Sequence, residues 1–251
     1  MRQKIFENTL DKRRLEEDRY HSVHDPHKRS SGLSDIILGG QDGLVNVLGV
    51  ILGLAAATHD PRIVLVGGLA ATFAESVSMG AVAYTSTLAD ADFYESERAR
   101  EFRHIAQVPH LEKDEIREIY SRKGFKGDLL DRIVETITAN EDVWVAVMMS
   151  EEHQLTPTDR RQAIKSALVV GLAAVIGSLI PLAPFAFLPV NHGMWVAVVI
   201  TAAVLFGVGA YKARTTVGHP GKSGLEMALI GTISALVGYG VGALLKIPVA
   251  S

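Results

Sequence analysis

The stretch Ser34-Asp-Ile-Ile-Leu-Gly-Gly-Gln-Asp-Gly-Leu-Val-Asn-Val-Leu-Gly-Val-Ile-Leu-Gly-Leu54 is long and apolar enough to cross a membrane, yet it places Asp42 and Asn46 well inside the apolar run. A bilayer core requires ~20 consecutive apolar residues in a helix. A charged side chain at that depth costs roughly 2.5 to 3.5 kcal/mol on insertion scales, and therefore marks a candidate functional site. Asp42 and Asn46 are four residues apart, so they share one face of the predicted helix.

Four more apolar stretches of similar length follow the first one. The expected membrane spans are residues 36–57, 63–88, 163–188, 194–211 and 225–245. These spans predict an all-α fold, an integral membrane bundle of five transmembrane helices. Three pairs of small residues spaced four apart predict close approach between helix backbones. They are Gly39 and Gly43, Gly49 and Gly53, and Gly238 and Gly242. Three prolines, Pro181, Pro184 and Pro189, predict a broken or kinked end to the third span.

Lysine and arginine predict the orientation of the chain in the membrane. All but Arg62 and Lys246 fall in residues 1–34, in residues 91–165, or in the connection between the last two spans. Positive charge accumulates on the cytoplasmic side, so the N-terminus and the central polar segment are expected there, and the C-terminus outside. Residues 1–34 are expected to form a cytoplasmic arm without a signal peptide.

The arm contains His21, His24 and His27, a spacing that resembles a row of metal ligands. Pro26 interrupts the helix that would align them. A solvated arm is therefore the preferred interpretation over a metal site.

The polar segment from 91 to 160 is expected to be a three-helix cytoplasmic domain between membrane segments 35–90 and 161–251. The second span has no Gly or Pro after Leu88, so its helix should continue to Val108-Pro109. A second helix is expected over about 111–122. A third should begin near 127 and end before Thr156-Pro157. Its apolar face would consist of Leu130, Ile133, Val134, Ile137, Val143 and Val147.

A second carboxylate lies within the membrane, in the second span. Glu75 and Met79 are four residues apart. Carboxylates from two neighbouring helices and a thioether one turn away form a ligand set suited to a divalent transition-metal ion. The alternative is that Asp42 caps a helix near the interface and Met79 fills the core. Glu226, in the first turn of the last span, is explained by the helix dipole and is only a minor candidate for the ion path.

The central segment is acidic, with 16 Asp and Glu against 10 Lys and Arg. This charge attracts cations and argues against nucleic acid or anionic lipid as a partner. The candidate metal ligands are Glu97, Glu101, His104, Glu112, Glu115, Met148, Met149 and Glu152, with Glu151 and His153 beside the last of them. Because the chain has no cysteine, thiolate sites and disulfides are excluded.

Three stretches of the sequence resemble the vacuolar iron transporter (VIT) family. They are Asp35-Ile-Ile-Leu-Gly-Gly-Gln-Asp-Gly-Leu44, Glu75-Ser-Val-Ser-Met-Gly-Ala81 and Ala91-Asp-Phe-Tyr-Glu-Ser-Glu97, and the Met148-Met149 pair adds to the similarity. The resemblance implies a homodimer that exports Fe2+, and often Mn2+, from the cytosol in exchange for protons. It also implies no permanent cofactor, although Co2+ or Zn2+ could be further cargo.

The resemblance also implies roles for individual residues. Asp42, Glu75 and Met79 would line the transport path, with Asn46 a less certain member. The cytoplasmic domain would collect metal with Glu101, Glu112, Glu115, Met148, Met149 and Glu152. His104 occupies the position of a glutamate in the family pattern. The implied membrane is the inner membrane of a prokaryote, or a vacuolar-type membrane in a eukaryote.

Two other functions remain open at this point. One is a manganese-selective exporter, because the ligand set does not separate Mn2+ from Fe2+. The other is a membrane-anchored metal sensor or storage scaffold, although an anchor has no need of intramembrane carboxylates. An enzyme is not expected, because the sequence contains no nucleophile elbow, phosphate loop or HExxH motif.

Overall fold

The computed structural model describes residues 31–245, and every regular element in this part of the chain is a helix. The expected N-terminal arm up to residue 30, its three histidines and Lys246 lie outside the described residues. The helices are α2 (Ser31–Thr58), α3 (Pro61–Gln107), α4 (Pro109–Arg122), α5 (Gly127–Thr138), α6 (Glu141–Val147), the π-helix η1 (Met148–Glu152), α7 (Arg161–Leu182), α8 (Pro184–Phe187), α9 (Val190–Thr215) and α10 (Pro220–Leu244).

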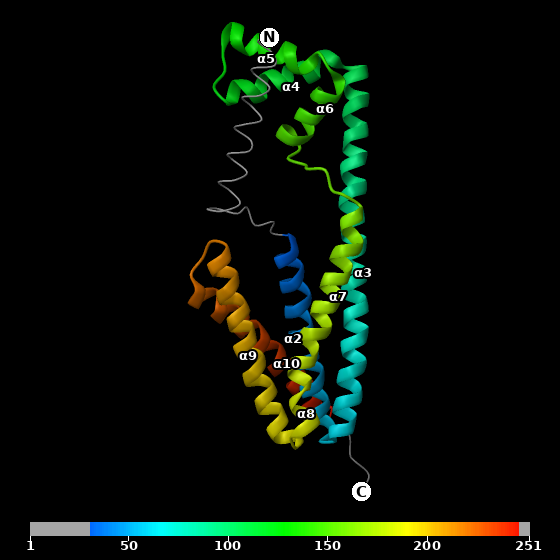
Figure 1. Ribbon diagram of the computed structural model, residues 1–251, viewed down its shortest axis with the longest axis vertical. Helices are drawn as coiled ribbons and strands as arrows, with labels where there is room; N and C mark the ends of the chain where they lie inside the picture. Colours follow the sequence, from blue (N-terminus) through cyan, green and yellow to red (C-terminus); the bar gives the residue numbers. More distant parts are fainter. Residues whose placement is uncertain (1–30, 246–251) are drawn as a thin grey trace, which may run out of the picture.

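Five of these helices, α2, α3, α7, α9 and α10, are long and apolar enough to cross a membrane. They form one bundle, and α4, α5 and α6 lie beyond it at one end of α3 (Figure 1). This confirms the all-α class and the five predicted spans. The fourth and fifth membrane-length helices, α9 and α10, begin earlier than expected, at Val190 and Pro220. A proline lies at each start, directly before Val190 in α9 and as the first residue of α10, and proline is favoured where a helix begins.

Helix α2 occupies the centre of the bundle, where it packs against α7, α10 and α3. Its glycines allow the backbones to touch. A methyl group on Gly39 would collide with the carbonyl of Val170 in α7, and one on Gly242 of α10 would collide with the carbonyl of Gly53. The predicted close approaches are therefore confirmed. The hydroxyl of Ser234 in α10 also donates to the carbonyl oxygen of Val45, at 3.2 Å.

The third span ends earlier than predicted. Helix α7 stops at Leu182 instead of continuing to residue 188, and the four-residue helix α8 follows. Pro184 has no backbone N–H with which to continue the helical ladder, so the chain turns there. The predicted break is confirmed, and the predicted end point was wrong.

Helix α3 is 47 residues long and continuous. The side chain of Asp60 caps its start by accepting from the backbone N–H of Arg62 at 2.7 Å, and the helix ends before Pro109. At 1.5 Å per residue it spans about 70 Å, whereas a bilayer core is about 30 Å thick. As predicted, the second half of the helix extends well beyond the membrane-spanning length.

The protruding end of α3 and helices α4, α5, α6 and η1 form a second packed unit, called here the helical block. Its core contains Ile105, Ile116, Val134, Trp144 and both methionines of η1. The core is separate from the apolar core of the bundle.

The predicted third helix of the block is in fact broken. The side chain of Asn140 accepts a hydrogen bond from the backbone N–H of Val143 at 3.1 Å and starts a new helix, α6. This break rotates the residues that follow. Val143, predicted to be buried, is 47% exposed, and Trp144 and Val145 are buried in its place. Leu130, Val134 and Ile137, which precede the break, are buried as expected.

Candidate functional site

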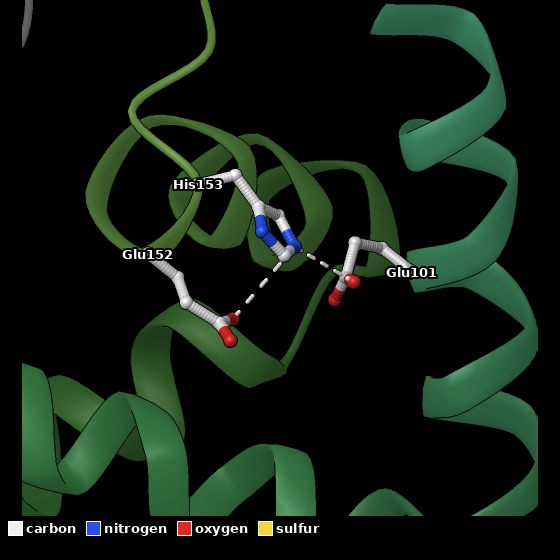
Figure 2. A group of neighbouring side chains, drawn as sticks. All are labelled: Glu101, Glu152 and His153. Atoms are coloured by element: carbon white, nitrogen blue, oxygen red, sulfur yellow. Dashed lines mark hydrogen bonds and ion pairs between the residues drawn. The ribbon is translucent and has the colours of Figure 1, made fainter. Parts of the chain in front are cut away.

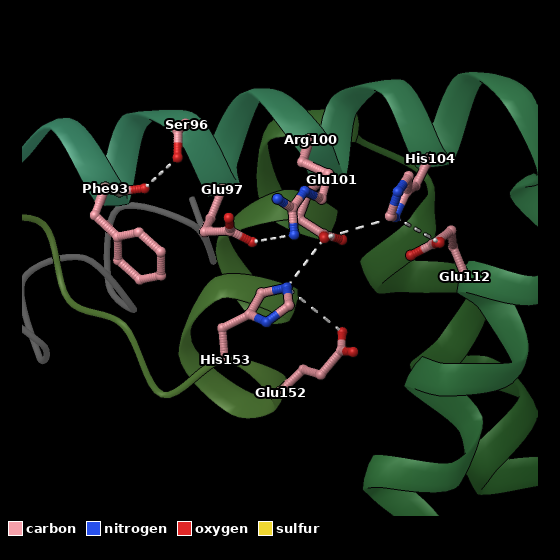
Figure 3. Close-up of polar contacts among 9 residues, drawn as sticks. All are labelled: Phe93, Ser96, Glu97, Arg100, Glu101, His104, Glu112, Glu152 and His153. Atoms are coloured by element: carbon pink, nitrogen blue, oxygen red, sulfur yellow. Dashed lines mark hydrogen bonds and ion pairs between the residues drawn. The ribbon is translucent and has the colours of Figure 1, made fainter.

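Glu101 is the centre of a group of charged side chains in the helical block. It lies on the inner face of α3 and is 2% exposed. Its Oε1 atom is 3.0 Å from Nε2 of His153 and 3.8 Å from Nδ1 of His104 (Figure 3). One buried carboxylate therefore contacts two imidazoles, one from its own helix and one from the residue that follows η1.

Two groups of three potential metal ligands share Glu101. The first consists of Glu101, Glu152 and His153 (Figure 2), and the second of Glu101, His104 and Glu112. In the first, Nε2 of His153 is 4.0 Å from Oε2 of Glu152. In the second, Nδ1 of His104 is 3.5 Å from Oε1 of Glu112. These five residues are called here the glutamate–histidine cluster.

Two carboxylate oxygens of the cluster are buried without a hydrogen-bond partner among the described residues. They are Oε2 of Glu101 and Oε2 of Glu112. A buried carboxylate oxygen that lacks a donor is costly, and a bound cation would compensate it. The geometry and the missing donors therefore both suit cation binding.

The crowding of carboxylates changes their proton affinity. Burial, followed by the charges of Glu115, Glu101 and Glu152, raises the pKa of Glu112 to about 7. Burial and the charge of Glu115 also raise the pKa of Glu152, against the opposing effect of His153. A metal ion that bound these oxygens near neutral pH would therefore have to compete with protons.

The pKa of His153 is also raised. Burial alone lowers it, but the hydrogen bond to Glu101 and the charges of Glu152, Glu101 and Glu97 outweigh burial. A protonated His153 thus stabilises the carboxylates of the cluster when no metal is bound. A metal ion would replace this proton, because an imidazole ligand must be neutral.

The other predicted ligands of the block are placed differently. Glu97 is buried, pairs with Arg100 at 3.1 Å, and belongs to neither group of three. Glu115 interacts with Glu112 and so lies beside the cluster. Met148 and Met149 are buried in the apolar core of the block. Their role as sulfur ligands stays a prediction.

His153 stood beside the predicted ligand Glu152 in the sequence, and the structure brings it into the first group of three. The π-helical turn of η1 precedes it, and the backbone N–H of His153 donates to the carbonyl of Met148 at 3.2 Å. Such turns shift the side chains that follow relative to an ordinary α-helix, and they are frequent at functional sites. The only sequence signal for His153 was its position next to Glu152.

The membrane candidates form a separate site on α2 and α3. The carboxyl groups of Asp42 and Glu75 interact directly across the contact between these helices. Asp42 also lines a small cavity of about 220 Å³ between α2 and α10. Glu75 and Met79 are half-buried, and Asn46 is exposed on the outer face of α2. Thr72 and Ser76, on the same helix as Glu75, donate to carbonyls of that helix, so their hydroxyls are already satisfied.

A bundle of five membrane-length helices, with paired carboxylates inside it and a glutamate–histidine cluster beyond it, defines a polytopic membrane protein equipped to handle cations. The chain belongs to the VIT family, which matches residues 33–243.

Similar proteins carry a consistent name. Vacuolar iron transporter 1 of Oryza sativa subsp. japonica is 34% identical over 224 residues, which cover 88% of this chain and 89% of that protein. Vacuolar iron transporter 2 of the same organism is 34% identical over 239 residues, 95% of this chain and 96% of that protein. Vacuolar iron transporter 1 of Eucalyptus grandis is 35% identical over 208 residues, 82% of this chain and 84% of that protein.

Proposed function

We propose that this protein is a proton-coupled antiporter that exports Fe2+, Mn2+ or both from the cytosol. The observation that carries the proposal is the direct interaction of Asp42 and Glu75 between two adjacent membrane-length helices. Two acidic groups in contact at this depth are costly unless they bind a cation or a proton. The names of the relatives, vacuolar iron transporters, supply the cargo that fits this site.

The helical block would capture the ion before transport. It lies at the end of the bundle where α2 starts and where the α9–α10 connection lies, and the α2–α3 turn is at the opposite end (Figure 1). The first of these ends carries Lys212, Arg214 and Lys222, and the other carries Arg62. This charge distribution supports a cytoplasmic location for the block.

A homodimer is part of the proposal. Asn46 is exposed on the outer face of α2, and Glu75 and Met79 are partly exposed on α3. Polar groups facing lipid are unfavourable, and membrane proteins bury them against other helices. A second copy of the chain packed on this surface would cover these groups and enclose the path between the two subunits.

Proton exchange would follow from the chemistry of the carboxylates. A carboxylate must be deprotonated to bind a metal ion, so each ion that binds displaces protons. Protons that enter from the far side would then release the ion from Asp42 and Glu75. The direction of transport is set by whichever gradient is larger.

Flux measurements in proteoliposomes test this function. Fe2+, Mn2+, Co2+ and Zn2+ are supplied in parallel outside the vesicles, and metal entry and internal pH are recorded together. Asp42→Asn and Glu75→Gln should each reduce metal-dependent proton flux to that of protein-free vesicles. Asp90→Asn, which removes an exposed carboxylate of α3, is the matched control and should leave flux unchanged.

The same assay separates the alternatives. Normal flux in either membrane variant would overturn the assigned path. Flux with Mn2+ alone would identify a manganese-selective exporter. Metal binding without flux in the wild-type protein would identify a sensor or storage scaffold.

A further inference from the structure

Each of the two ligand groups in the glutamate–histidine cluster contains one imidazole. His104 belongs to the group with Glu112, and His153 belongs to the group with Glu152. The two histidines come from different elements, α3 and the segment after η1. They approach the same oxygen, Oε1 of Glu101.

The spacing of these atoms suits metal coordination. Two ligand atoms that each lie about 2.1 Å from one ion can be at most about 4.2 Å apart. In the first group, Nε2 of His153 is 3.0 Å from the Glu101 oxygen and 4.0 Å from the Glu152 oxygen. In the second, Nδ1 of His104 is 3.8 Å from the Glu101 oxygen and 3.5 Å from the Glu112 oxygen. These four nitrogen–oxygen distances are within this limit, and all ligand atoms of each group lie within 4.8 Å of one another.

The carboxylate of Glu101 is placed to bind a cation in each of the two ligand groups. Its Oε1 atom contacts both imidazoles, and its Oε2 atom is buried without a hydrogen-bond donor from residues 31–245. The same is true of Oε2 of Glu112, so each unpaired oxygen belongs to a side chain that is at least nine-tenths buried. A carboxylate with two available oxygens can bridge two neighbouring ions.

We propose that His104 and His153 are nitrogen ligands of two cation positions bridged by Glu101, and that they give the block a preference for Fe2+, Co2+ and Zn2+ over Mn2+. Imidazole suits iron, cobalt and zinc, whereas sites made only of carboxylates suit manganese, magnesium and calcium. Two nitrogen donors therefore increase the affinity for Fe2+, Co2+ and Zn2+ more than the affinity for Mn2+. The inference rests on the proposed capture of metal by the block and specifies which ions it favours.

Metal titrations of the full chain in detergent test this assignment. The chain carries Asp42→Asn and Glu75→Gln, so that bound metal reports the block and not the membrane path. Co2+, an air-stable probe for Fe2+, is titrated alone and against Mn2+. His104→Gln and His153→Gln should each weaken Co2+ binding roughly tenfold or more and weaken Mn2+ binding much less. His110→Gln, an exposed histidine of α4, is the matched control and should change neither.

A second substitution replaces a nitrogen ligand by an oxygen ligand. His104→Glu restores a carboxylate and should lower the ratio of Co2+ to Mn2+ affinity without abolishing binding. Pulsed EPR of Mn2+ bound to the unsubstituted block provides a readout that needs no histidine variant, because coordinated imidazole gives a nitrogen coupling. That coupling is expected from both positions.

The outcomes separate the inference from the proposed function. Metal binding with an unchanged Co2+ to Mn2+ ratio in both glutamine variants, or no nitrogen coupling, would overturn the role of the histidines and leave metal capture standing. A block that binds no metal would overturn both capture and the inference. Transport through Asp42 and Glu75 would still be decided by the flux assay alone.

Discussion

The imidazole of His153 lies 3.0 Å from the carboxylate of Glu101, although the two residues are 52 positions apart in the sequence. This contact ties the end of the π-helix to the protruding half of α3. The hydrogen bond to Glu101 and the charges of the nearby carboxylates raise the pKa of His153 against the effect of burial, which favours a charge-assisted pair in the metal-free protein. The residues that would bind metal thus also hold the block together when metal is absent.

Metal binding by the block should strengthen as pH rises from 6 to 8. The pKa of Glu112 is about 7, so this carboxyl is largely protonated at pH 6 and largely ionised at pH 8. Calorimetric titration of Co2+ at several pH values measures the effect. Glu112→Gln should weaken binding and flatten its pH dependence, and Glu118→Gln, which removes an exposed carboxylate of α4, should do neither. Equal Co2+ affinity at pH 6 and pH 8 would contradict the assignment.

Without metal, stability should fall as pH rises. The pKa of Glu112 is higher in the folded protein than its ordinary value of 4.5, so the folded state binds this proton more tightly than the unfolded state does. Its contribution is therefore full below pH 4.5 and is lost as pH rises to about 7. His153, whose pKa is also raised, acts in the same direction.

Thermal unfolding in the presence of EDTA, between pH 5 and pH 8, measures this slope. The melting temperature should decrease over the range, and Glu112→Gln should decrease less steeply. Added Co2+ should raise the melting temperature more at pH 8 than at pH 6, because binding to the folded state stabilises it. A melting temperature that increases with pH in EDTA would refute the predicted sign.

Two glycines of α10 provide a matched pair for testing the packing of the bundle. A methyl group on Gly242 would collide with the carbonyl of Gly53, whereas one on Gly240 would meet nothing within 4 Å. Gly242→Ala should destabilise the protein by about 1 to 3 kcal/mol, the usual cost of overpacking. Gly240→Ala should be neutral or slightly stabilising, because alanine favours helix more than glycine does. Similar melting temperatures for both variants would show that the α2–α10 contact tolerates separation.

The proposed dimer predicts a cross-link through the outer face of α2. The chain has no cysteine, so Asn46→Cys introduces a single thiol. Bifunctional thiol reagents of short reach should join two copies in native membranes. Val199→Cys, on the exposed face of α9 and 63% exposed, should remain monomeric on a denaturing gel. The opposite pattern would move the subunit interface to α9.

The membrane spans and the length of α3 could be predicted because each depends on local composition. A run of about 20 apolar residues crosses a bilayer as a helix, because its backbone groups must be hydrogen-bonded within the segment. A polar segment without Gly or Pro contains no residue that ends a helix, so α3 was expected to continue through it. The break at Asn140 could not be predicted in this way. Asparagine occurs within helices as well as at their first turn, and it is the hydrogen bond from the backbone N–H of Val143 to the Asn140 side chain, together with the burial of Trp144, that shows the start of a new helix there.

The candidate sites were predictable to different degrees. Asp42 and Glu75 stand out because carboxylates are rare in apolar runs. Glu101, His104 and Glu112 were candidates because the central segment is rich in carboxylates, and Glu101 and His104, three residues apart, share one face of α3. The convergence of His153 on Glu101 depends on a π-helical turn and on the fold of the whole block, so no periodicity in the sequence reveals it.

The continuous helix α3 carries both Glu75 and Glu101, and this sets how an ion would travel between them. The two residues are 26 positions apart on one helix, a rise of about 39 Å. No ligand of the cluster can reach across that distance to the membrane carboxylates. An ion released by the block would have to cross this distance before it reached Asp42 and Glu75. The block would then act as a local reservoir that increases the encounter rate.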